Sequence, residues 1–189
     1  MECNRAYAFA VGRIVRAIKR LVLRVGFQVL RVYWFVRKPK AYGVKCAVVA
    51  GDQVVLVRHT YGDRHVWDMP GGAIKRGETP VEAGRREVRE EIGVEPSEWR
   101  ELGGVFLIIR GKRNRLFGCA AIVDADAPVR VDEVEIAEAR WFPRDHLPEP
   151  RTVWVELFTE AAIEGRDIAS GTTLTPPRRR RRIAMVPRP

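Results

Sequence analysis

Short apolar runs and helical segments alternate along the middle of the chain. Residues 43–50 and 54–58 are β-branched runs separated by Gly51-Asp52-Gln53, a pattern typical of a β-hairpin. Further strands are predicted over residues 105–109, 116–123 and 139–142, helices over 79–92 and 153–164, and a basic hairpin turn over 110–115. Strands and helices in this order predict an α/β fold, a sandwich with a mixed sheet.

The first 40 residues show a different, one-sided pattern. Projected on a helix, their basic residues fall within an arc of roughly 140°, and the remaining surface is mostly apolar. The basic residues in this arc are Arg5, Arg13, Arg16, Lys19, Arg20, Arg24, Arg31, Arg37 and Lys38. We therefore predict a long basic amphipathic helix over residues 1–40, which attaches to an anionic membrane surface through residues 1–38. Packing on the rest of the chain or in a homodimer is the alternative, and nucleic acid is a less favoured partner because the apolar face is wide.

The formal charge is divided in the same way. The chain carries +10, with 34 Lys and Arg against 24 Asp and Glu, yet residues 41–177 hold 18 basic and 23 acidic residues. No acidic residue occurs between Cys3 and Gly51, and a run of arginines begins at Arg178. Composition therefore divides the chain into the helix over 1–40, one domain over 41–168, and a basic tail over 169–189 that we expect to be disordered.

Several classes of protein are disfavoured by the same sequence. Arg24 and Arg31 interrupt every apolar window of about twenty residues, which argues against a membrane span. No apolar core ends at a small-residue cleavage site, which argues against a cleaved signal peptide. Cys3, Cys46 and Cys119 have neither a disulfide pattern nor zinc spacing, and the last two are expected in the core. We expect a cytoplasmic protein, peripheral at the inner membrane face if the amphipathic helix binds lipid.

The predicted helix over 79–92 has clear start and stop signals. Thr79 and Glu82 form a capping-box pattern, and Pro80 occupies the first helical turn, where proline is tolerated. Gly93 follows the last helical residue, where a left-handed backbone commonly ends a helix. The helix is therefore predicted from local sequence alone.

Three carboxylates share one face of this helix. Glu87, Glu90 and Glu91 stand at i, i+3 and i+4. Like charges on one face repel, and a hard divalent cation, Mg²⁺ or Mn²⁺, would compensate them, because such cations take oxygen ligands and bridge carboxylates to substrate phosphates. A solvated acidic face is the alternative, but Pro70-Gly71-Gly72 precedes the helix as a turn whose backbone can approach a ligand closely.

Residues 72–94 resemble the Nudix box, G-x5-E-x7-R-E-U-x-E-E-x-G-U with U aliphatic, at every defined position. The preceding residues 67–72 resemble the W-x-x-P-G-G segment common in that family, and the likeness extends over roughly 42–165. The resemblance implies a Nudix-type α/β/α sandwich. It also implies a hydrolase of acid anhydrides, in which a metal-activated water attacks a pyrophosphate bond in a nucleoside diphosphate linked to another moiety.

The resemblance further implies a role for each matched residue. Arg86 corresponds to the arginine that orients the helix carboxylates, and Glu78 to the glutamate that braces the loop. The implied ligands of Mg²⁺ or Mn²⁺ are the Gly71 carbonyl, Glu87, Glu90 and Glu91.

Two residues are candidates for the general base, because family members differ in which glutamate removes the proton of the attacking water. Glu87 is one candidate and lies beside Arg86. Glu135 is the other, in an acidic loop over 132–135 that precedes the predicted strand 139–142. A positioned general base typically increases the reaction rate by roughly 10²–10⁴-fold.

The substrate is less clearly indicated than the reaction. Arg58, Tyr61 and Trp67 are candidates for contacts with a base or phosphates, while Trp67 is also a natural core residue. The residue sixteen positions after Val94 is Arg110, so the proline or tyrosine that marks two substrate subclasses of the family is absent there. A Nudix-fold binding or regulatory module, attached to membrane or nucleic acid by its basic ends, is the alternative function.

Overall fold

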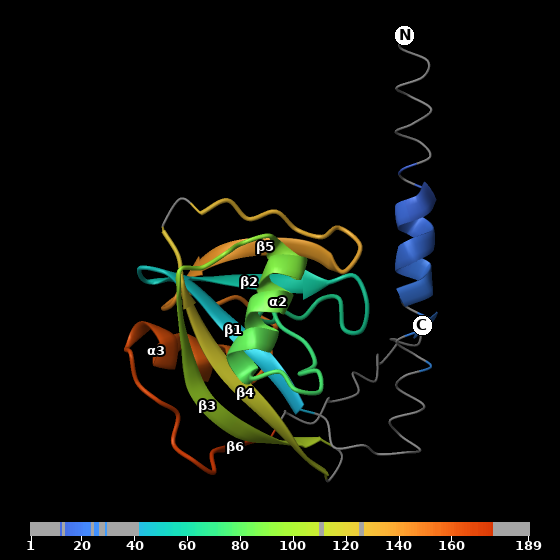
Figure 1. Ribbon diagram of the computed structural model, residues 1–189. Helices are drawn as coiled ribbons and strands as arrows, with labels where there is room; N and C mark the ends of the chain where they lie inside the picture. Colours follow the sequence, from blue (N-terminus) through green and yellow to red (C-terminus); the bar gives the residue numbers. More distant parts are fainter. Residues whose placement is uncertain are drawn as a thin grey trace, which may run out of the picture.

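The computed structural model describes residues 12, 14–23, 25–26, 29, 42–109, 112–124 and 127–175. Its core is a six-stranded sheet of order β5-β2-β1-β4-β3-β6 (Figure 1). The strands are β1 (Tyr42–Ala50), β2 (Gln53–His59), β3 (Glu98–Ile109), β4 (Lys112–Ile122), β5 (Ile136–Pro143) and β6 (Thr173–Leu174). β1 pairs with β4, and β3 with β6, in parallel, whereas the other neighbours are antiparallel, which confirms the mixed sheet.

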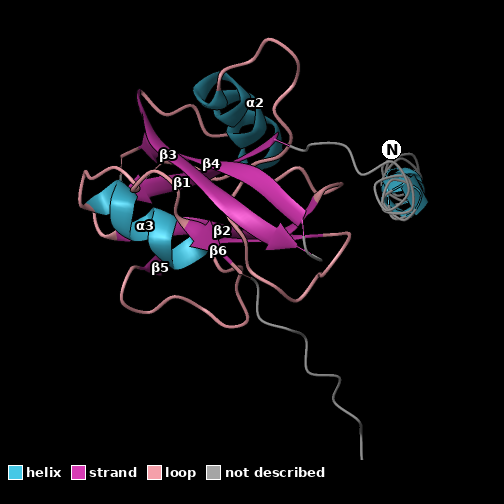
Figure 2. Cartoon of the chain, turned by 90° about the horizontal axis from the view of Figure 1, so that it is seen from below, coloured by secondary structure: helices cyan, strands magenta, loops and turns pink. Residues whose placement is uncertain are grey.

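Two helices cover opposite faces of this sheet (Figure 2). α2 (Pro80–Ile92) packs on the face that carries Val44, Cys46 and Val48, and α3 (Val155–Ile163) packs on the face that carries Ala47 and Val49. Alternate residues of β1 therefore serve two separate cores, as a strand with both faces covered requires. The expected α/β/α sandwich is confirmed.

The signals at both ends of α2 act as its sequence indicates. Thr79 accepts a hydrogen bond from the Glu82 N–H, and the Glu82 carboxylate accepts one from the Thr79 N–H at 2.8 Å. Gly93 ends the helix with φ of 65°, in the left-handed region. Between them, Gly84 faces β1 so closely that a Cβ there would lie 2.8 Å from the Cys46 sulfur. The helix is thus fixed both along its axis and against the sheet.

Two elements differ from the sequence-based expectation. β3 begins at Glu98 rather than at residue 105, because the polar segment before 105 pairs with β4 across a bulge between Glu101 and Gly103. The domain also runs past residue 168. Thr173–Leu174 form β6, and Leu174 packs on the α3-side core, so the expected boundary of a disordered tail at 169 is wrong.

The N-terminal helix comprises the described helical residues Gly12, 14–23, 25–26 and Val29. The remaining residues of the predicted 1–40 helix, and residues 176–189 of the predicted tail, lie outside the described residues. Within the part of the chain that is described, no helix is both long and apolar enough to cross a membrane. Cys46 and Cys119 are free and buried, as expected.

The capping box gives a direct test of what fixes the start of α2. Thr79→Ala removes the side chain that accepts the Glu82 N–H, so we expect a loss of about 0.5–2 kcal/mol in the free energy of unfolding. This loss corresponds to about 2–4 °C in melting temperature per kcal/mol for a chain of this size. Thr79→Ser keeps the hydroxyl and serves as the matched control in thermal unfolding. Equal melting temperatures for the two variants would contradict a stabilising role for the cap.

Candidate active site

The turn before α2 is bound to β1 and to the helix at once. The Val44 N–H donates to the Gly72 carbonyl at 2.9 Å, and the Cys46 N–H donates to the Pro70 carbonyl at 2.8 Å. Gly71 has φ of 140°, and a Cβ there would lie 2.3 Å from the Val44 carbonyl oxygen, so only glycine fits. The Gly71 N–H donates to the Glu91 carboxylate at 2.9 Å. The turn thereby presents its backbone to the acidic face of α2.

Arg86 holds the other carboxylates of that face. Its guanidinium donates to Glu87 at 2.6 Å and to Glu78 at 2.8 and 3.0 Å, and lies 3.5 Å from Glu90. It also donates to the Ala73 carbonyl at 3.0 Å. Its hydrogen bond to Glu78 is the main reason that the pKa of Glu78 falls to about 2. These contacts are those that an orienting arginine and a loop-bracing glutamate would make.

The acidic loop over 132–135 reaches the same region from the other side. The Asp132 N–H donates to the Glu91 carbonyl at 2.9 Å, and the Thr60 N–H donates to the Glu135 carbonyl at 2.8 Å. The Thr60 hydroxyl donates to the Val134 carbonyl at 2.6 Å. Burial, followed by the carboxylates of Asp132, Glu87 and Glu90, raises the pKa of Glu135. The loop therefore brings Glu135 within electrostatic range of the α2 carboxylates.

A buried lysine beneath the turn was not singled out from the sequence. The Lys45 ammonium lies 2.7 Å from the Asp68 carboxylate and donates to the carbonyls of Met69 at 3.0 Å and Gly71 at 3.3 Å. Burial disfavours the ammonium, but the attraction of Asp68 and Glu91 outweighs it and raises the pKa of Lys45. A lone lysine inside the apolar run 43–50 was the available signal, because a charge at such a position needs a partner.

Asp68 connects this lysine to α3. Its second carboxylate oxygen accepts hydrogen bonds from the Met69 N–H, the Thr152 hydroxyl and the Trp154 indole N–H, all within 2.9 Å. Despite burial, Lys45 lowers the pKa of Asp68. The carboxylate of Asp68 and the ammonium of Lys45 are therefore both charged. The network ties β1, the turn and the start of α3 into one unit.

The three candidate substrate contacts have different outcomes. Trp67 is 7% exposed and packs edge-on against Phe142, so it is a core residue and not an accessible contact. Arg58 lies over the Trp67 ring, 4.9 Å from its centroid, and forms an ion pair with Glu138, while its side chain stays 33% exposed. Trp67 is therefore not the accessible substrate contact that the sequence suggested, whereas a contact of Arg58 with substrate stays a prediction.

Tyr61 is the candidate that lies beside the carboxylates. Burial and then the charges of Glu135, Glu91 and Glu87 raise the pKa of its hydroxyl. Its ring lies 5.1 Å from that of His59. The His59 Nδ1 atom is buried without a hydrogen-bond partner and is 4.0 Å from the Glu91 carboxylate. Burial lowers the pKa of His59 to about 4, so the ring is neutral near pH 7.

The oxygen atoms on the acidic face of α2 show whether a divalent cation would fit this site. Within the described residues, no three His, Cys, Asp or Glu side chains converge as a ready set of ligands, because Arg86 holds Glu87 and the Gly71 N–H holds Glu91. The donors are nevertheless all oxygens on one helix face, as Mg²⁺ and Mn²⁺ require. Burial also raises the pKa of Glu91 to about 8, which marks a carboxylate short of compensating charge. The residues fit such a cation after rotation of their side chains.

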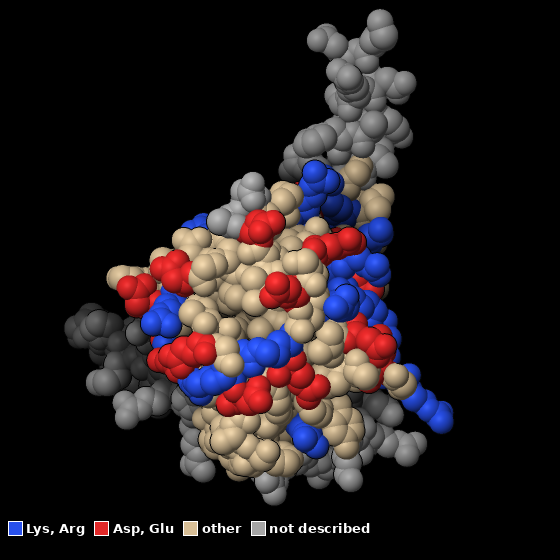
Figure 3. All heavy atoms as spheres, turned by 60° about the vertical axis from the view of Figure 1, so that its left-hand side comes forward, with Lys and Arg blue, Asp and Glu red and all other residues tan. Residues whose placement is uncertain are grey.

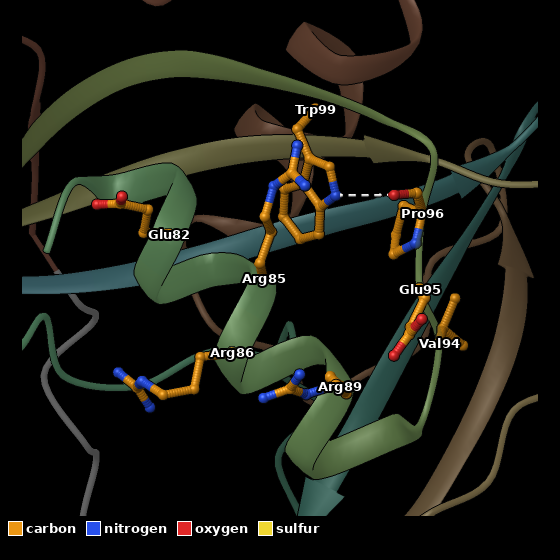
Figure 4. Close-up of a pocket in the computed structure, with 8 residues that line it drawn as sticks. All are labelled: Glu82, Arg85, Arg86, Arg89, Val94, Glu95, Pro96 and Trp99. Carbon is orange, nitrogen blue, oxygen red and sulfur yellow. Dashed lines mark hydrogen bonds between the residues drawn. The ribbon is translucent and has the colours of Figure 1, made fainter.

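A separate surface cavity of about 480 Å³ lies over the outer side of α2 (Figure 4). Arg85, Arg86 and Arg89 line it from the helix, and Trp99 lines it from β3. The Arg85 guanidinium covers the Trp99 ring at 5.6 Å, and the Trp99 indole N–H donates to the Pro96 carbonyl at 3.1 Å. The cavity lies on the outer side of α2, and Arg86 lines it while also contacting the carboxylates of the candidate site.

The buried Glu91 carboxylate predicts a pH-dependent stability. Its folded pKa, about 8, lies above its ordinary value of 4.5, so its contribution to stability is full below the ordinary value and is lost as pH rises through the folded one. In metal-free protein we therefore expect Glu91→Gln to match the parent in melting temperature near pH 5 and to exceed it by several degrees near pH 8.5. Glu90→Gln, at a side chain 54% exposed, is the control and should show no such divergence. A parallel pH dependence for parent and Glu91→Gln would refute the assignment.

The chain matches known proteins over the region just described. The NUDIX domain family matches residues 39–161. An uncharacterized Nudix hydrolase of Pseudomonas aeruginosa is 36% identical over 89 residues, 46% of this chain and 52% of that protein. An NAD-capped RNA hydrolase of Mycobacterium tuberculosis is 33% identical over 105 residues, 55% of this chain and 33% of that protein. The chain thus spans about half or less of the length of these curated relatives.

Solved structures show the same fold. The MutT NUDIX hydrolase from Burkholderia pseudomallei superposes with a TM-score of 0.55 at 24% identity, over 64% of this chain and 95% of that chain. A UDP-X diphosphatase superposes with a TM-score of 0.52 at 24% identity, over 71% of this chain and 66% of that chain. Because the family match spans more than half of the chain and contains the complete box, this protein belongs to the Nudix hydrolase family.

Proposed function

We propose that the chain hydrolyses a pyrophosphate bond in a nucleoside diphosphate linked to another moiety. The observation that carries this proposal is the buried Glu91 carboxylate, held against the Gly71 N–H beside Glu87. A buried carboxylate with so little compensation is typical of functional sites, and a cation that bridges carboxylates to phosphates would compensate it. The names of two matched relatives, an NAD-capped RNA hydrolase and an ADP-ribose pyrophosphatase, belong to this chemical class.

The residues proposed to hold Mg²⁺ or Mn²⁺ are the Gly71 carbonyl, Glu87, Glu90 and Glu91. A bound cation would supply neutralisation of the pyrophosphate charge and a lowered pKa of water. Arg86 keeps Glu87 at its position through a hydrogen bond of 2.6 Å, and Glu78 in turn fixes Arg86. Lys45 binds the Gly71 carbonyl from below at 3.3 Å and so sets the direction of the turn. These residues provide positioning, which is the main requirement of phosphoryl transfer chemistry.

Glu135 is the better candidate for the general base. One oxygen of Glu87 already accepts a hydrogen bond from Arg86 at 2.6 Å, so that oxygen is engaged. The Glu135 carboxylate, by contrast, forms no hydrogen bond or ion pair within the described residues, and its pKa is raised toward the working range of a base. We infer that Glu135 removes the proton of the attacking water, while Glu87 binds the cation.

Turnover that depends on a divalent cation tests the proposal as a whole. We expect phosphate or nucleotide release from a panel of nucleotide sugars, dinucleotides and ADP-ribose with Mg²⁺, and its loss with chelator. Glu91→Gln should lower this turnover by roughly 10²-fold or more, because it removes one buried charge from the cation site. Glu95→Gln, the same change at an exposed position beyond the helix, is the matched control. No turnover on any substrate would favour the binding-module alternative, and full turnover by Glu91→Gln would refute the site.

The assignment of the base requires a comparison of two variants. We expect Glu135→Gln to lower kcat by about 10²–10⁴-fold with little change in the Mg²⁺ concentration that gives half-maximal activity. Glu87→Gln should instead raise that concentration. Glu133→Gln, two residues from Glu135 in the same loop, is the control and should retain kcat. If Glu87→Gln shows the large loss in kcat at saturating Mg²⁺ and Glu135→Gln does not, the base is Glu87.

A further inference from the structure

The N-terminal helix contacts the domain through its cationic side. The Arg20 guanidinium donates to the Glu133 carbonyl at 2.9 Å, and the Arg16 guanidinium lies 3.4 Å from the Glu133 carboxylate. Arg16 and Arg20 are four residues apart and therefore share one face of the helix. In both ribbon views the helix stands beside the domain, not on the sheet (Figures 1 and 2).

The opposite face of this helix is an apolar stripe that the domain does not cover. Its members recur at helical spacing within an arc of roughly 120°. The stripe residues and their exposed fractions are Ile14 59%, Val15 44%, Ile18 55%, Leu21 58%, Val22 64%, Val25 56% and Val29 63%. Only two other large apolar residues in the described part of the chain are comparably exposed, Tyr42 and Ile122.

This orientation is the reverse of that in an ordinary surface helix. Such a helix buries its apolar stripe on the core and turns its charges to water. Here Arg16 and Arg20 face the domain, and the stripe is exposed on the other side of the helix. A continuous exposed stripe of Val, Ile and Leu on a monomer marks a surface that another phase or molecule covers.

The positive charge of the N-terminal residues indicates what covers the apolar stripe. No acidic residue occurs between Cys3 and Gly51, and residues 1–40 contain ten Lys or Arg against a single Glu. Anionic headgroups would neutralise this excess of positive charge, whereas a second copy of the same helix would add to it. On the face of the domain seen in Figure 3, acidic and basic side chains are interspersed. Residues 41–177 hold 18 basic and 23 acidic residues, so the excess positive charge lies in the two ends of the sequence.

We propose that the stripe from Ile14 to Val29 lies in the interface of an anionic lipid membrane, and that Arg16 and Arg20 join the membrane-bound helix to the domain through Glu133. The helix would then lie parallel to the membrane, with its apolar side among the acyl chains. Lys19, at the margin of the stripe, is placed to reach the headgroups. The joint at Glu133 is two residues from Glu135, so the attachment holds the acidic loop of the active site near the lipid surface.

Two substitutions at adjacent residues separate the stripe from charge alone. Ile18→Glu and Ala17→Glu change the net charge equally, and both positions are exposed, but only Ile18 belongs to the stripe. Sedimentation of the full chain with vesicles of phosphatidylcholine, with and without phosphatidylglycerol, gives the partition coefficient of each variant. Hydrolysis of a soluble substrate by the same preparations shows that the domain stays folded.

We expect the parent chain to sediment with the anionic vesicles and to be partly released by salt. Ala17→Glu should weaken this binding by about fivefold, the effect of one charge, and Ile18→Glu by about a further tenfold, because it also places a carboxylate in the acyl region. Absence of sedimentation, or equal losses for the two variants, would overturn the proposal. So would a dimer in light scattering that Ile18→Glu dissociates, since a second copy would then cover the stripe, or retention by RNA without binding to vesicles.

Discussion

Glu91 imposes the constraint on which the site depends. Its carboxylate is 3% exposed, and one N–H, from Gly71, donates to it. Taking a carboxylate out of water costs several kcal/mol unless charge and hydrogen bonds compensate it. The protein provides part of that compensation through Lys45 and leaves the rest unmet, which is why burial raises the pKa of Glu91 to about 8. Glu91 is therefore the group of the site to which a bound cation would add the most compensating charge.

The geometry of the turn follows from this partial compensation. If Lys45 reached Glu91 directly, the two charges would compensate each other and Glu91 would need no further cation. Instead the Lys45 ammonium pairs with Asp68 at 2.7 Å and touches the Gly71 carbonyl at 3.3 Å. Asp68 is itself fixed by Thr152 and Trp154 from the segment that leads into α3. The turn is therefore positioned from both faces of the sheet, and Glu91 stays the least compensated group of the network.

Local sequence was enough to predict the parts of the site that interact within a few turns of chain. The caps of α2, the shared face of Glu87, Glu90 and Glu91, and the contact of Glu78 with Arg86 all join residues fewer than about twenty positions apart. The contacts that could not be predicted join distant segments. Lys45 and Asp68 are 23 positions apart, Asp68 and Trp154 are 86 apart, and neither pair has a periodic signal.

The same distinction explains the errors in the fold and substrate assignments. Trp67 was a candidate contact because it precedes the turn, but the structure buries it against Phe142 from β5. β6 is a two-residue edge strand that pairs with β3 at Phe106 and Leu107, and two residues are too few for a sequence pattern to predict a strand. Short elements of this kind gain their order from tertiary contacts, so a boundary drawn from composition placed it in the tail.

The acidic loop over 132–135 serves two surfaces because of its tight turn. The Glu135 and Ile136 N–H groups both donate to the Asp132 carbonyl, at 3.1 and 2.8 Å, which closes the loop into a single compact turn. Residues two apart in such a turn point in different directions, so Glu133 meets the arginines of the N-terminal helix while Glu135 lies near the carboxylates of α2. The backbone of this turn is bonded to both Glu91 and Thr60. The hydrogen bonds that fix the backbone of this turn therefore position Glu133 and Glu135 together.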